Sequence, residues 1–273
     1  MLIYGKKVRE QIREEIHQQA MQIKMKLAVV RVGDDRSSLA YVKGIQNFAT
    51  DTGIALDLIE LSADSEESQV FEKILALNND RSVTGIMIQT PLPENLSFPR
   101  LLNAIDYHKD VEGIHNFNLG KLISKEDGVK PSTPKAVLRM LKAYNIPLEG
   151  QKVCIIGRST ILGLPLSIMM TAENATVTVC HTRTKNLADE IRSADIVVAC
   201  AGKINLITPD MITEDTVIID AGINFDESGK MCGDVHEEAR DKARICSAVP
   251  GGVGVITVAE LFDNLRILSE QAE

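Results

Sequence analysis

Short apolar segments alternate along this chain with amphipathic helical segments, and this alternation constrains the fold more than any other feature. The run KLAVVRVG at residues 26–33 ends at glycine and is followed by a helical pattern over 38–52. Strand-like runs return at 54–61 and 83–89, with a second helical pattern at 67–80 between them. Apolar strands in a strand–helix–strand rhythm predict a parallel sheet covered by helices on both faces.

The same rhythm returns in the C-terminal half of the chain. A helical pattern begins at Pro134, and β-rich runs follow at 152–157, 176–181, 195–202 and 216–222. We therefore predict an α/β fold of two domains with parallel sheets, the second of them Rossmann-like. The predicted domains are residues 1–113, completed by a C-terminal helix at 257–273, and residues 114–256.

Composition and charge exclude several classes of protein. The chain of 273 residues is 44% hydrophobic and 25% charged, which is typical of a globular protein. A net charge of −8 disfavours nucleic acid and membrane surfaces as partners, because both attract basic proteins. The sequence shows no membrane-spanning run and no signal-peptide core, so we expect a cytoplasmic protein. Five scattered cysteines predict free thiols rather than disulfides or a metal site.

The glycines after the first strand of the second domain suggest a nucleotide site. Residues 152–165, KVCIIGRSTILGLP, have the pattern of a strand, a glycine turn and a helix. A glycine at this turn lets backbone N–H groups approach a pyrophosphate at the positive end of the helix. Gly157 and Gly163 do not match G-x-G-x-x-G, however, so an ordinary strand-to-helix turn remains an alternative.

The end of the next strand indicates which dinucleotide would bind. NAD-specific folds usually place a carboxylate there, which binds the ribose 2′-hydroxyl. This chain has CHTRTKN at 180–186, with Thr182, Arg183 and Lys185 and no acidic residue. Arg158 lies in the preceding turn. Convergent basic side chains suit a 2′-phosphate and predict NADP, with NAD possible, whereas the alternative is a solvated basic loop.

A glycine-rich loop precedes the last helical segment. VPGGVGVIT at 249–257 places three glycines within five residues. Such a loop can approach a flat ligand closely, and Thr257 is placed to cap the final helix. The alternative is a hinge between domains that contacts no ligand.

Taken together, these motifs resemble one family. GRSTILGLP, CHTRTKN, IIDAGIN, GDV and PGGVG, with VGDD, IQTPLP and KDVEG in the N-terminal half, are similar to the bifunctional 5,10-methylenetetrahydrofolate dehydrogenase/5,10-methenyltetrahydrofolate cyclohydrolase family. The resemblance covers essentially the whole chain. It implies a homodimeric enzyme of one-carbon metabolism and purine biosynthesis, with a folate-binding catalytic domain and an NADP-binding domain. Such an enzyme oxidises methylenetetrahydrofolate and hydrolyses the methenyl product to 10-formyltetrahydrofolate.

The resemblance also implies roles for individual residues. The catalytic set would be Tyr41, which flanks the folate, Gln89, which supports the family's active-site lysine, and Asp110. The substrate-binding set would add Pro91, Leu92, Glu112, Gly251, Gly252 and Val253. The cofactor-binding set would be Gly157, Arg158, Ser159, Thr182, Arg183 and Ile223. An acidic pair at Asp110 and Glu112 suits a folate, because carboxylates accept paired hydrogen bonds from an aminopyrimidine ring.

The most consequential departure from the family pattern concerns the lysine itself. The family has Tyr-Val-x-x-Lys, and counting from Tyr41 reaches Ile45. Lys43 lies about 200° around the helix from Tyr41, whereas Ile45 lies one turn on, on the same face. We therefore expect Lys43 to be a solvated surface residue. Smaller departures at Thr90, Glu112, Ser132 and Val255–Ile256 indicate an altered folate pocket.

Loss of the lysine affects the two reactions of the family differently. Hydride transfer needs positioning and exclusion of water, whereas water addition needs proton transfer, worth about 10² to 10⁴ in rate. We therefore expect a dehydrogenase whose cyclohydrolase step is weak or absent. The alternatives are a non-catalytic NADP- or folate-binding paralogue, a fully bifunctional enzyme with a compensating base, and a different NADP enzyme that resembles shikimate dehydrogenase.

Overall fold

The computed structural model describes residues 1–271, apart from the side chains of Arg36 and Ser37, so the last two positions of the predicted C-terminal helix lie outside the described residues. The chain divides into two compact units. Unit 1 comprises Met1–Arg9 and Thr133–Thr257, and unit 2 comprises Glu10–Ser132 and the residues from Val258 onward. Helices α1 (Lys6–Ala20) and α10 (Val253–Gln271) each contribute residues to both units.

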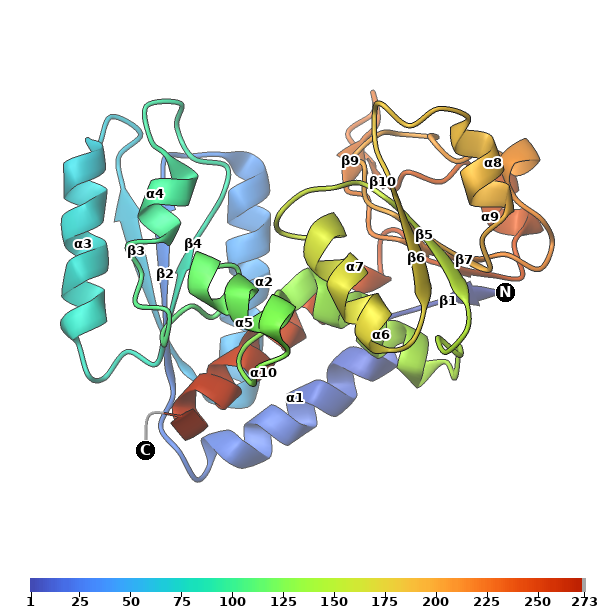
Figure 1. Cartoon of the computed structure of the whole chain (residues 1–273). Coiled ribbons are helices and arrows are strands. Elements are labelled where there is room, and N and C mark those ends of the chain that lie inside the picture. The colour runs from blue at the N-terminus through green and yellow to red at the C-terminus, as the bar shows by residue number, and fades with distance from the viewer. Residues whose placement is uncertain (272–273) are drawn as a thin grey trace. The chain divides into compact units, whose positions relative to one another are not determined.

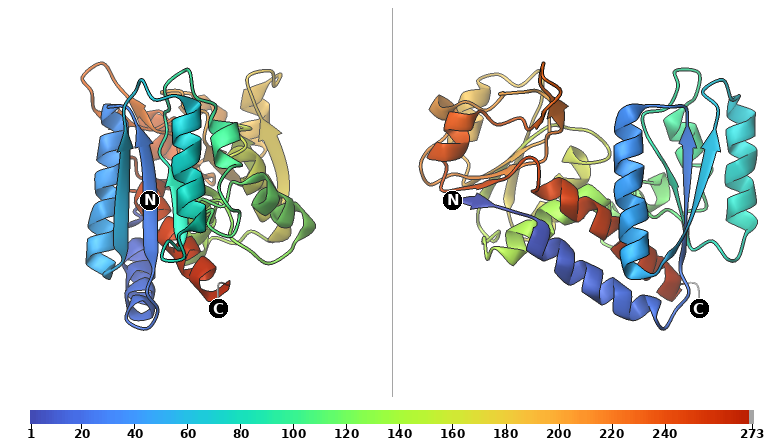
Figure 2. Two further views of the ribbon diagram at one scale, coloured as in Figure 1. Left: turned by 90° about the vertical axis from the view of Figure 1, so that its left-hand side faces the viewer. Right: turned by 180° about the vertical axis from the view of Figure 1, so that it is seen from behind.

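Unit 2 is a three-layered α/β structure. Its strands pair in parallel in the order β3 (Ala55–Leu61), β2 (Lys26–Val32), β4 (Gly85–Ile88). Helices α3 (Glu67–Asn79) and α4 (Phe98–Leu102) lie on one face of the sheet and α2 (Arg36–Thr52) on the other (Figure 1). The same layers are visible from two further directions in Figure 2. The predicted parallel sheet with helices on both faces is confirmed.

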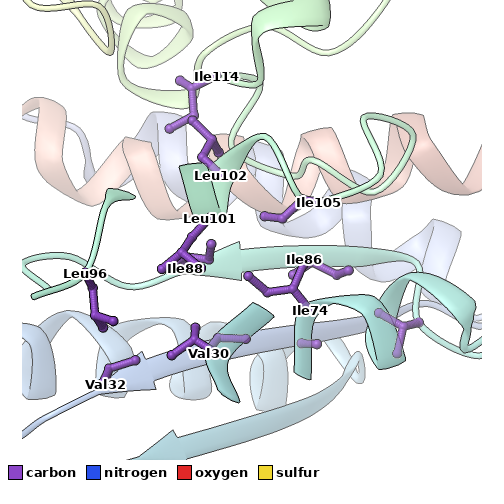
Figure 3. Close-up of a cluster of buried hydrophobic side chains, with 13 residues drawn as sticks. Val30, Val32, Ile74, Ile86, Ile88, Leu96, Leu101, Leu102, Ile105 and Ile114 are labelled. Carbon is purple, nitrogen blue, oxygen red and sulfur yellow. The ribbon is translucent and has the colours of Figure 1, made fainter. Parts of the chain in front are cut away.

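Alternate residues of β2 divide the core of unit 2 between the two faces of the sheet. Val30 and Val32 face α3 and α4, where they join a cluster of buried side chains that includes Ile74, Ile86 and Leu101 (Figure 3). Leu27 and Val29 alternate with these residues along β2, so their side chains point to the opposite face of the sheet, where α2 lies (Figure 1). Helix α2 carries the tyrosine–lysine pattern. The apolar face of α2 is therefore fixed by packing rather than by local propensity.

Helix α10 completes this second face. The ring centroids of Phe48 on α2 and Phe262 on α10 lie 4.8 Å apart, and both side chains are fully buried. Residues of α10 from Val258 onward therefore belong to the same core as α2.

Unit 1 contains a six-stranded, fully parallel sheet of the Rossmann type. Its order is β1 (Leu2–Ile3), β11 (Ile245–Ser247), β8 (Val217–Asp220), β7 (Ile196–Ala199), β5 (Lys152–Ile156), β6 (Thr176–Cys180). Helix α7 (Gly163–Ala172) lies on one side of the sheet and α8 (Leu187–Arg192) and α9 (Glu237–Lys242) on the other (Figure 1). The predicted Rossmann-like sheet is confirmed.

The remaining elements connect or decorate these sheets. Helices α5 (Asn116–Ser124) and α6 (Ser132–Ala143) link the two halves of the sequence, and η1 (Pro209–Met211) is a short 3₁₀ turn. Strands β9 (Asn224–Phe225) and β10 (Met231–Cys232) form an antiparallel hairpin. All five cysteines are free thiols, as predicted. Among the described residues, no helix combines the length and apolar character needed to cross a membrane.

The prediction that Thr257 caps the final helix is wrong. Helix α10 begins at Val253, directly after the two glycines of the loop. Thr257 therefore lies one turn inside the helix, where its Oγ1 donates a hydrogen bond to the Val253 carbonyl (3.3 Å). The glycines turn the chain earlier than the sequence pattern suggested.

Candidate functional site

The tyrosine–lysine pattern lies on α2, whose ends are well defined. The helix starts where the Asp35 carboxylate accepts a hydrogen bond from the Ser38 N–H (2.9 Å), and it ends at Gly53 in the left-handed conformation. Ile45 is 0% exposed, and Lys43 is exposed to solvent. The prediction that these two positions occupy different faces of the helix is confirmed. The position that the family lysine would occupy is an apolar core position here.

Gln89 lies immediately beyond β4 and is almost fully buried. Its backbone N–H donates to the Val30 carbonyl (2.8 Å), and its side-chain Nε2 donates to the Thr90 carbonyl (2.5 Å). The Ser38 hydroxyl of α2 donates to that same carbonyl (3.1 Å). The other side-chain atom of Gln89, Oε1, is buried and has no hydrogen-bond partner among the described residues. Gln89 therefore presents an unpaired acceptor.

The three charged residues of the KDVEG motif have different surroundings, and Lys109 is a helix cap. Its Nζ donates to the carbonyls of Leu77 (3.0 Å), Asn78 (2.8 Å) and Asp80 (2.7 Å), at the C-terminus of α3. A cation there satisfies carbonyls that have no partner within the helix and complements the helix dipole. The Lys109 side chain thus stabilises the end of α3 and has a structural role.

Asp110 also has a structural role. It is 0% exposed, and its carboxylate accepts hydrogen bonds from the N–H groups of Gly113 (3.1 Å) and His115 (2.8 Å) and from Asn118 Nδ2 (2.9 Å). Three donors on one carboxylate leave little acceptor capacity for a ligand. Asp110 shapes the turn that carries the last residue of the motif.

Glu112 is the member of the motif that keeps an unpaired buried oxygen. Its Oε2 has no partner among the described residues. Burial, and secondarily the charge of Asp110, raises the pKa of Glu112 to about 8. Burial also raises the pKa of Tyr41, and the negative charge of Glu112 adds to this effect. Tyr41 and Glu112 therefore share one electrostatic neighbourhood.

Sequence reasoning missed the residue that holds the Glu112 segment in place. Asn264 of α10 donates from Nδ2 to the carbonyls of Val111 (2.9 Å) and Lys130 (2.8 Å). The backbone carbonyl of Glu112 accepts a hydrogen bond from the Ser132 N–H (3.2 Å). A buried amide inside an apolar helix was the available signal, because such a group must find partners.

The two residues predicted to bind substrate after Gln89 differ in exposure. Pro91 is exposed, and the Leu92 side chain is partly buried against the hydrophobic cluster of β2, β4 and α3. The side chain of Leu92 therefore contributes to the core.

The glycine turn of unit 1 has no room for side chains. Gly157 has a φ of +140°, and a Cβ there would fall 2.5 Å from the Cys200 carbonyl oxygen. A Cβ on Gly163 would overlap the Gly157 carbonyl. The Ser159 hydroxyl accepts a hydrogen bond from the Leu162 N–H (3.2 Å), which orders the turn before α7. The glycines therefore allow a compact main-chain turn directly before a helix, which is where a pyrophosphate binds in Rossmann-like folds.

The basic side chains predicted to bind a 2′-phosphate lie exposed beyond β6. The Arg183 N–H donates to His181 Nδ1 (3.0 Å), and the His181 N–H donates to Thr184 Oγ1 (2.8 Å), so local hydrogen bonds shape this loop. Thr182 and Arg183 are exposed, as is Arg158 in the glycine turn. Their side chains are available to a ligand.

The other predicted ligand contacts of unit 1 differ in exposure. Ile223, which follows β8, is 62% exposed, so its side chain is accessible to a ligand. Gly251 is half-buried, whereas Gly252 and Val253 are buried. The side chain of Val253 therefore belongs to the core.

The fold and these sites define a class, namely two-unit α/β proteins with a Rossmann-like nucleotide-binding unit. Comparison with known families identifies the particular one. Residues 3–112 match the tetrahydrofolate dehydrogenase/cyclohydrolase catalytic domain, and residues 131–273 match the NAD(P)-binding domain of the same name. The chain belongs to the tetrahydrofolate dehydrogenase/cyclohydrolase family. This membership sets aside the alternative of a shikimate dehydrogenase-like enzyme.

Individual relatives match over the full length. The bifunctional protein FolD 2 of Syntrophomonas wolfei is 63% identical over 272 residues, covering 100% of both chains. The crystal structure of a bifunctional FolD methylenetetrahydrofolate dehydrogenase/cyclohydrolase from Campylobacter jejuni has a TM-score of 0.96 and 38% identity, covering 99% of each chain. A Trypanosoma brucei FolD structure in complex with NADP and an inhibitor has a TM-score of 0.94 and 29% identity, covering 99% of this chain and 97% of that one.

Proposed function

We propose that this protein is an NADP-dependent methylenetetrahydrofolate dehydrogenase whose cyclohydrolase step is weak or absent. The reaction class is supported by the family and by relatives that carry both activities in their names. The observation that carries the asymmetry is Ile45, fully buried where the family lysine is expected. Gln89 Oε1 and Glu112 Oε2 are buried acceptors without a donor among the described residues, as expected if a cationic partner has been lost.

In this proposal the residues of unit 2 bind the folate without supplying a lysine base. Glu112 accepts hydrogen bonds from the aminopyrimidine edge as a carboxylate, because N–H donors of the bound ring favour the ionised form. Tyr41 flanks the ring, and Asp110 positions the Glu112 turn. Burial raises the pKa of Tyr41, so its phenol stays neutral at physiological pH and is a poor base. An apolar Ile45 cannot carry a proton to or from an attacking water.

In unit 1, the turn at Gly157, Arg158 and Ser159 holds the pyrophosphate, while Thr182 and Arg183 bind the 2′-phosphate. Bound NADP supplies a hydride acceptor. Ile223 and the backbone at Gly251, Gly252 and Val253 would border the nicotinamide and the folate. NAD would lack the 2′-phosphate that Arg183 is placed to bind, so NADP is the preferred cofactor.

A second candidate is a fully bifunctional enzyme in which Glu112 is the compensating base. A specific observation favours it, because a carboxyl group with a pKa of about 8 is tuned for proton transfer near neutral pH. This candidate predicts rapid hydrolysis that is lost when Glu112 is made neutral. It shares the dehydrogenase step with the first proposal.

We also propose, on the family resemblance, that the protein is a cytoplasmic homodimer in one-carbon metabolism. Sedimentation analysis should then give twice the chain mass of 29.9 kDa. A monomeric mass at assay concentration would contradict the dimer without affecting the proposed chemistry.

The function is tested by supplying methylenetetrahydrofolate with NADP or NAD and following NADPH, methenyl- and 10-formyltetrahydrofolate separately. We expect NADPH and methenyltetrahydrofolate to form together, with formyl product appearing at the spontaneous rate. Enzymatic hydrolysis well above that rate would contradict the first candidate and favour the second. Ligand binding without NADPH production would instead identify a non-catalytic paralogue.

A further inference from the structure

We infer that Asp234 is a positioning residue of the dinucleotide site, and that it sets the backbone of two loops at the carboxyl edge of the unit 1 sheet. These are the segment 200–205 after β7, called the β7 loop, and the segment 221–224, which runs from the end of β8 to the first residue of β9 and is called the β8 loop. The inference rests on the proposed binding of NADP by unit 1. It assigns a role to the GDV motif, for which the proposed function itself has no use.

The carboxylate of Asp234 is fully buried and fully occupied. It is 0% exposed, and its Oδ2 accepts hydrogen bonds from the N–H groups of Ala201 (2.7 Å) and Gly202 (3.0 Å). Its Oδ1 accepts from the Lys203 N–H (2.8 Å) and from Asn224 Nδ2 (2.9 Å). Three successive backbone N–H groups of the β7 loop and one side chain of the β8 loop therefore converge on a single carboxylate.

The two loops that Asp234 joins lie where a dinucleotide binds in a Rossmann-like sheet. Strands β8, β7 and β5 are neighbours, and their carboxyl ends are the ligand edge of a parallel sheet. The β7 loop starts at Cys200, whose carbonyl lies against Gly157 of the phosphate turn. Ile204 in the β7 loop and Ile223 in the β8 loop are both exposed apolar side chains. Asp234 thus links the β7 loop, which lies against the phosphate turn, to the β8 loop, which carries the predicted nicotinamide contact Ile223.

A second buried carboxylate holds Asp234 in register. Asp220, at the end of β8, accepts hydrogen bonds from the backbone N–H groups of Gly222 (3.0 Å), Asp234 (3.1 Å) and Val235 (3.1 Å). A Cβ on Gly222 would overlap the Asp234 carboxylate, and a Cβ on Gly233 would overlap that of Asp220. The IIDAGIN and GDV motifs therefore pack tightly against each other through these hydrogen bonds and glycines. Because both motifs are fixed, the β7 and β8 loops have a single preferred arrangement.

The inference is tested with Asp234→Asn in the full-length protein, with Asp226→Asn as the matched control. Asp226 also accepts several hydrogen bonds, from the Ser228 N–H (2.9 Å), Ser228 Oγ (2.6 Å) and the Lys230 N–H (2.9 Å), but it serves the β9–β10 turn. An amide keeps the size of the side chain and replaces one acceptor oxygen by a donor, which opposes the inward-pointing N–H groups.

We expect Asp234→Asn to raise the Kd and the KM for NADP about tenfold or more, the scale expected for lost charge-assisted hydrogen bonds, with the folate KM within about twofold of wild type. Asp226→Asn should leave all three values unchanged. Asn224→Ala, which removes one of the four donors, should raise the NADP KM by a smaller factor and covers the case in which Asp234→Asn does not fold.

Folded Asp234→Asn with the wild-type Kd for NADP would overturn the inference, as would equal rises in the NADP and folate KM values. If Asp234→Asn does not fold, an unchanged NADP KM in Asn224→Ala would overturn it. Failure of the wild-type protein to bind NADP in the same titration would instead overturn the proposed function. The two failures are therefore distinguishable.

Discussion

At the residue scale, position 45 lies where packing and proton transfer conflict. An isoleucine there fills the core between α2 and the sheet, and it is among the largest fully buried side chains of the protein. A lysine amine at the same place would have to be desolvated, which costs free energy unless acceptors meet it. The family resemblance implies that Gln89 supports such a lysine, and the buried Gln89 Oε1 has no hydrogen-bond partner among the described residues. With isoleucine at position 45 the core is more apolar than it would be with lysine, but the protein lacks a group there that can carry a proton.

Ile45→Lys should therefore add cyclohydrolase activity. We expect formation of 10-formyltetrahydrofolate to rise by about 10² to 10⁴, the usual contribution of a positioned acid–base group, while hydride transfer stays within a few-fold. The measurement is the ratio of the two products at steady state. Ile45→Met, which preserves apolar packing, and Lys43→Met, on the exposed face, are the controls and should gain nothing. A folded, hydride-active Ile45→Lys variant without hydrolysis would contradict the assignment.

Glu112 provides a pH-dependent prediction. The pKa of Glu112 is about 8 in the fold against an ordinary 4.5, so the folded state favours the neutral form. Its stabilising contribution is present in full below about pH 4.5 and is lost as the pH rises through about 8. Glu112→Gln, neutral at every pH, should match wild type near pH 5 and be more stable near pH 9, by about 1–2 kcal/mol after allowing for partial exposure. Urea unfolding at both pH values measures this difference.

The same variant tests the binding role of Glu112. An amide cannot accept paired hydrogen bonds from an aminopyrimidine, so we expect Glu112→Gln to raise the folate KM about tenfold or more. Glu112→Asp keeps the charge and should retain more affinity. An unchanged folate KM in Glu112→Gln would show that Glu112 does not bind the folate. If the wild-type protein hydrolyses methenyltetrahydrofolate and Glu112→Gln does not, the second candidate function is favoured.

At the element scale, Lys109 links the KDVEG motif to helix α3. Its ammonium group meets three carbonyls at the helix C-terminus, so Lys109→Met should leave them without that donor. We expect a loss of about 1–2 kcal/mol in the free energy of unfolding, from the cap and the helix dipole together. Denaturant titration measures it, and Lys73→Met, an exposed lysine of the same helix, is the control. Equal stability of the two variants would show that the cap contributes nothing.

The elements that the sequence predicts well are those with long, uniform patterns. The apolar run at 26–33 and the helical pattern at 67–80 report burial directly, because β2 is buried over nearly its whole length and Val70 and Ile74 are buried on one face of α3. Strands β1 and β11 have two and three residues and carry no period that a pattern could reveal. They exist because the neighbouring strand offers hydrogen-bond partners, which is tertiary information.

Sequence motifs and the family resemblance name a set of candidate site residues, but they do not say which role each residue has. The two acidic residues of KDVEG look equivalent in sequence. In the structure, however, the Asp110 carboxylate accepts hydrogen bonds from three local donors, whereas Glu112 Oε2 has no partner among the described residues. Asn264 acts on the same turn from the far end of the chain. The hydrogen bonds of the folded chain decide these roles, some of them local and some from distant segments, and a single sequence does not record which of them form.

At the scale of the whole molecule, the chain passes between its two units more than once. Residues 1–9 and 133–257 form unit 1, so the N-terminus completes a unit built mainly from the C-terminal half. The Met1 carbonyl accepts from the Cys246 N–H (2.9 Å) and the Ile3 carbonyl from the Ala248 N–H (2.9 Å), which adds β1 to the edge of the sheet. The first residues of the sequence therefore support the sheet that carries the proposed NADP site.

This topology predicts that a lesion at the N-terminus weakens the nucleotide-binding unit. Ile3 is 1% exposed, so Ile3→Ala should lower the free energy of unfolding by about 2–4 kcal/mol, and saturating NADP should recover part of the loss by mass action. Thermal unfolding with and without NADP measures both effects. Leu2→Ala, at a neighbouring side chain that is 40% exposed, should change stability by about 0.5 kcal/mol or less. If the two variants have the same melting temperature, or if NADP does not protect Ile3→Ala, residues 1–9 do not stabilise unit 1. An edge strand that stabilises a sheet must lose that contribution when its buried side chain is truncated.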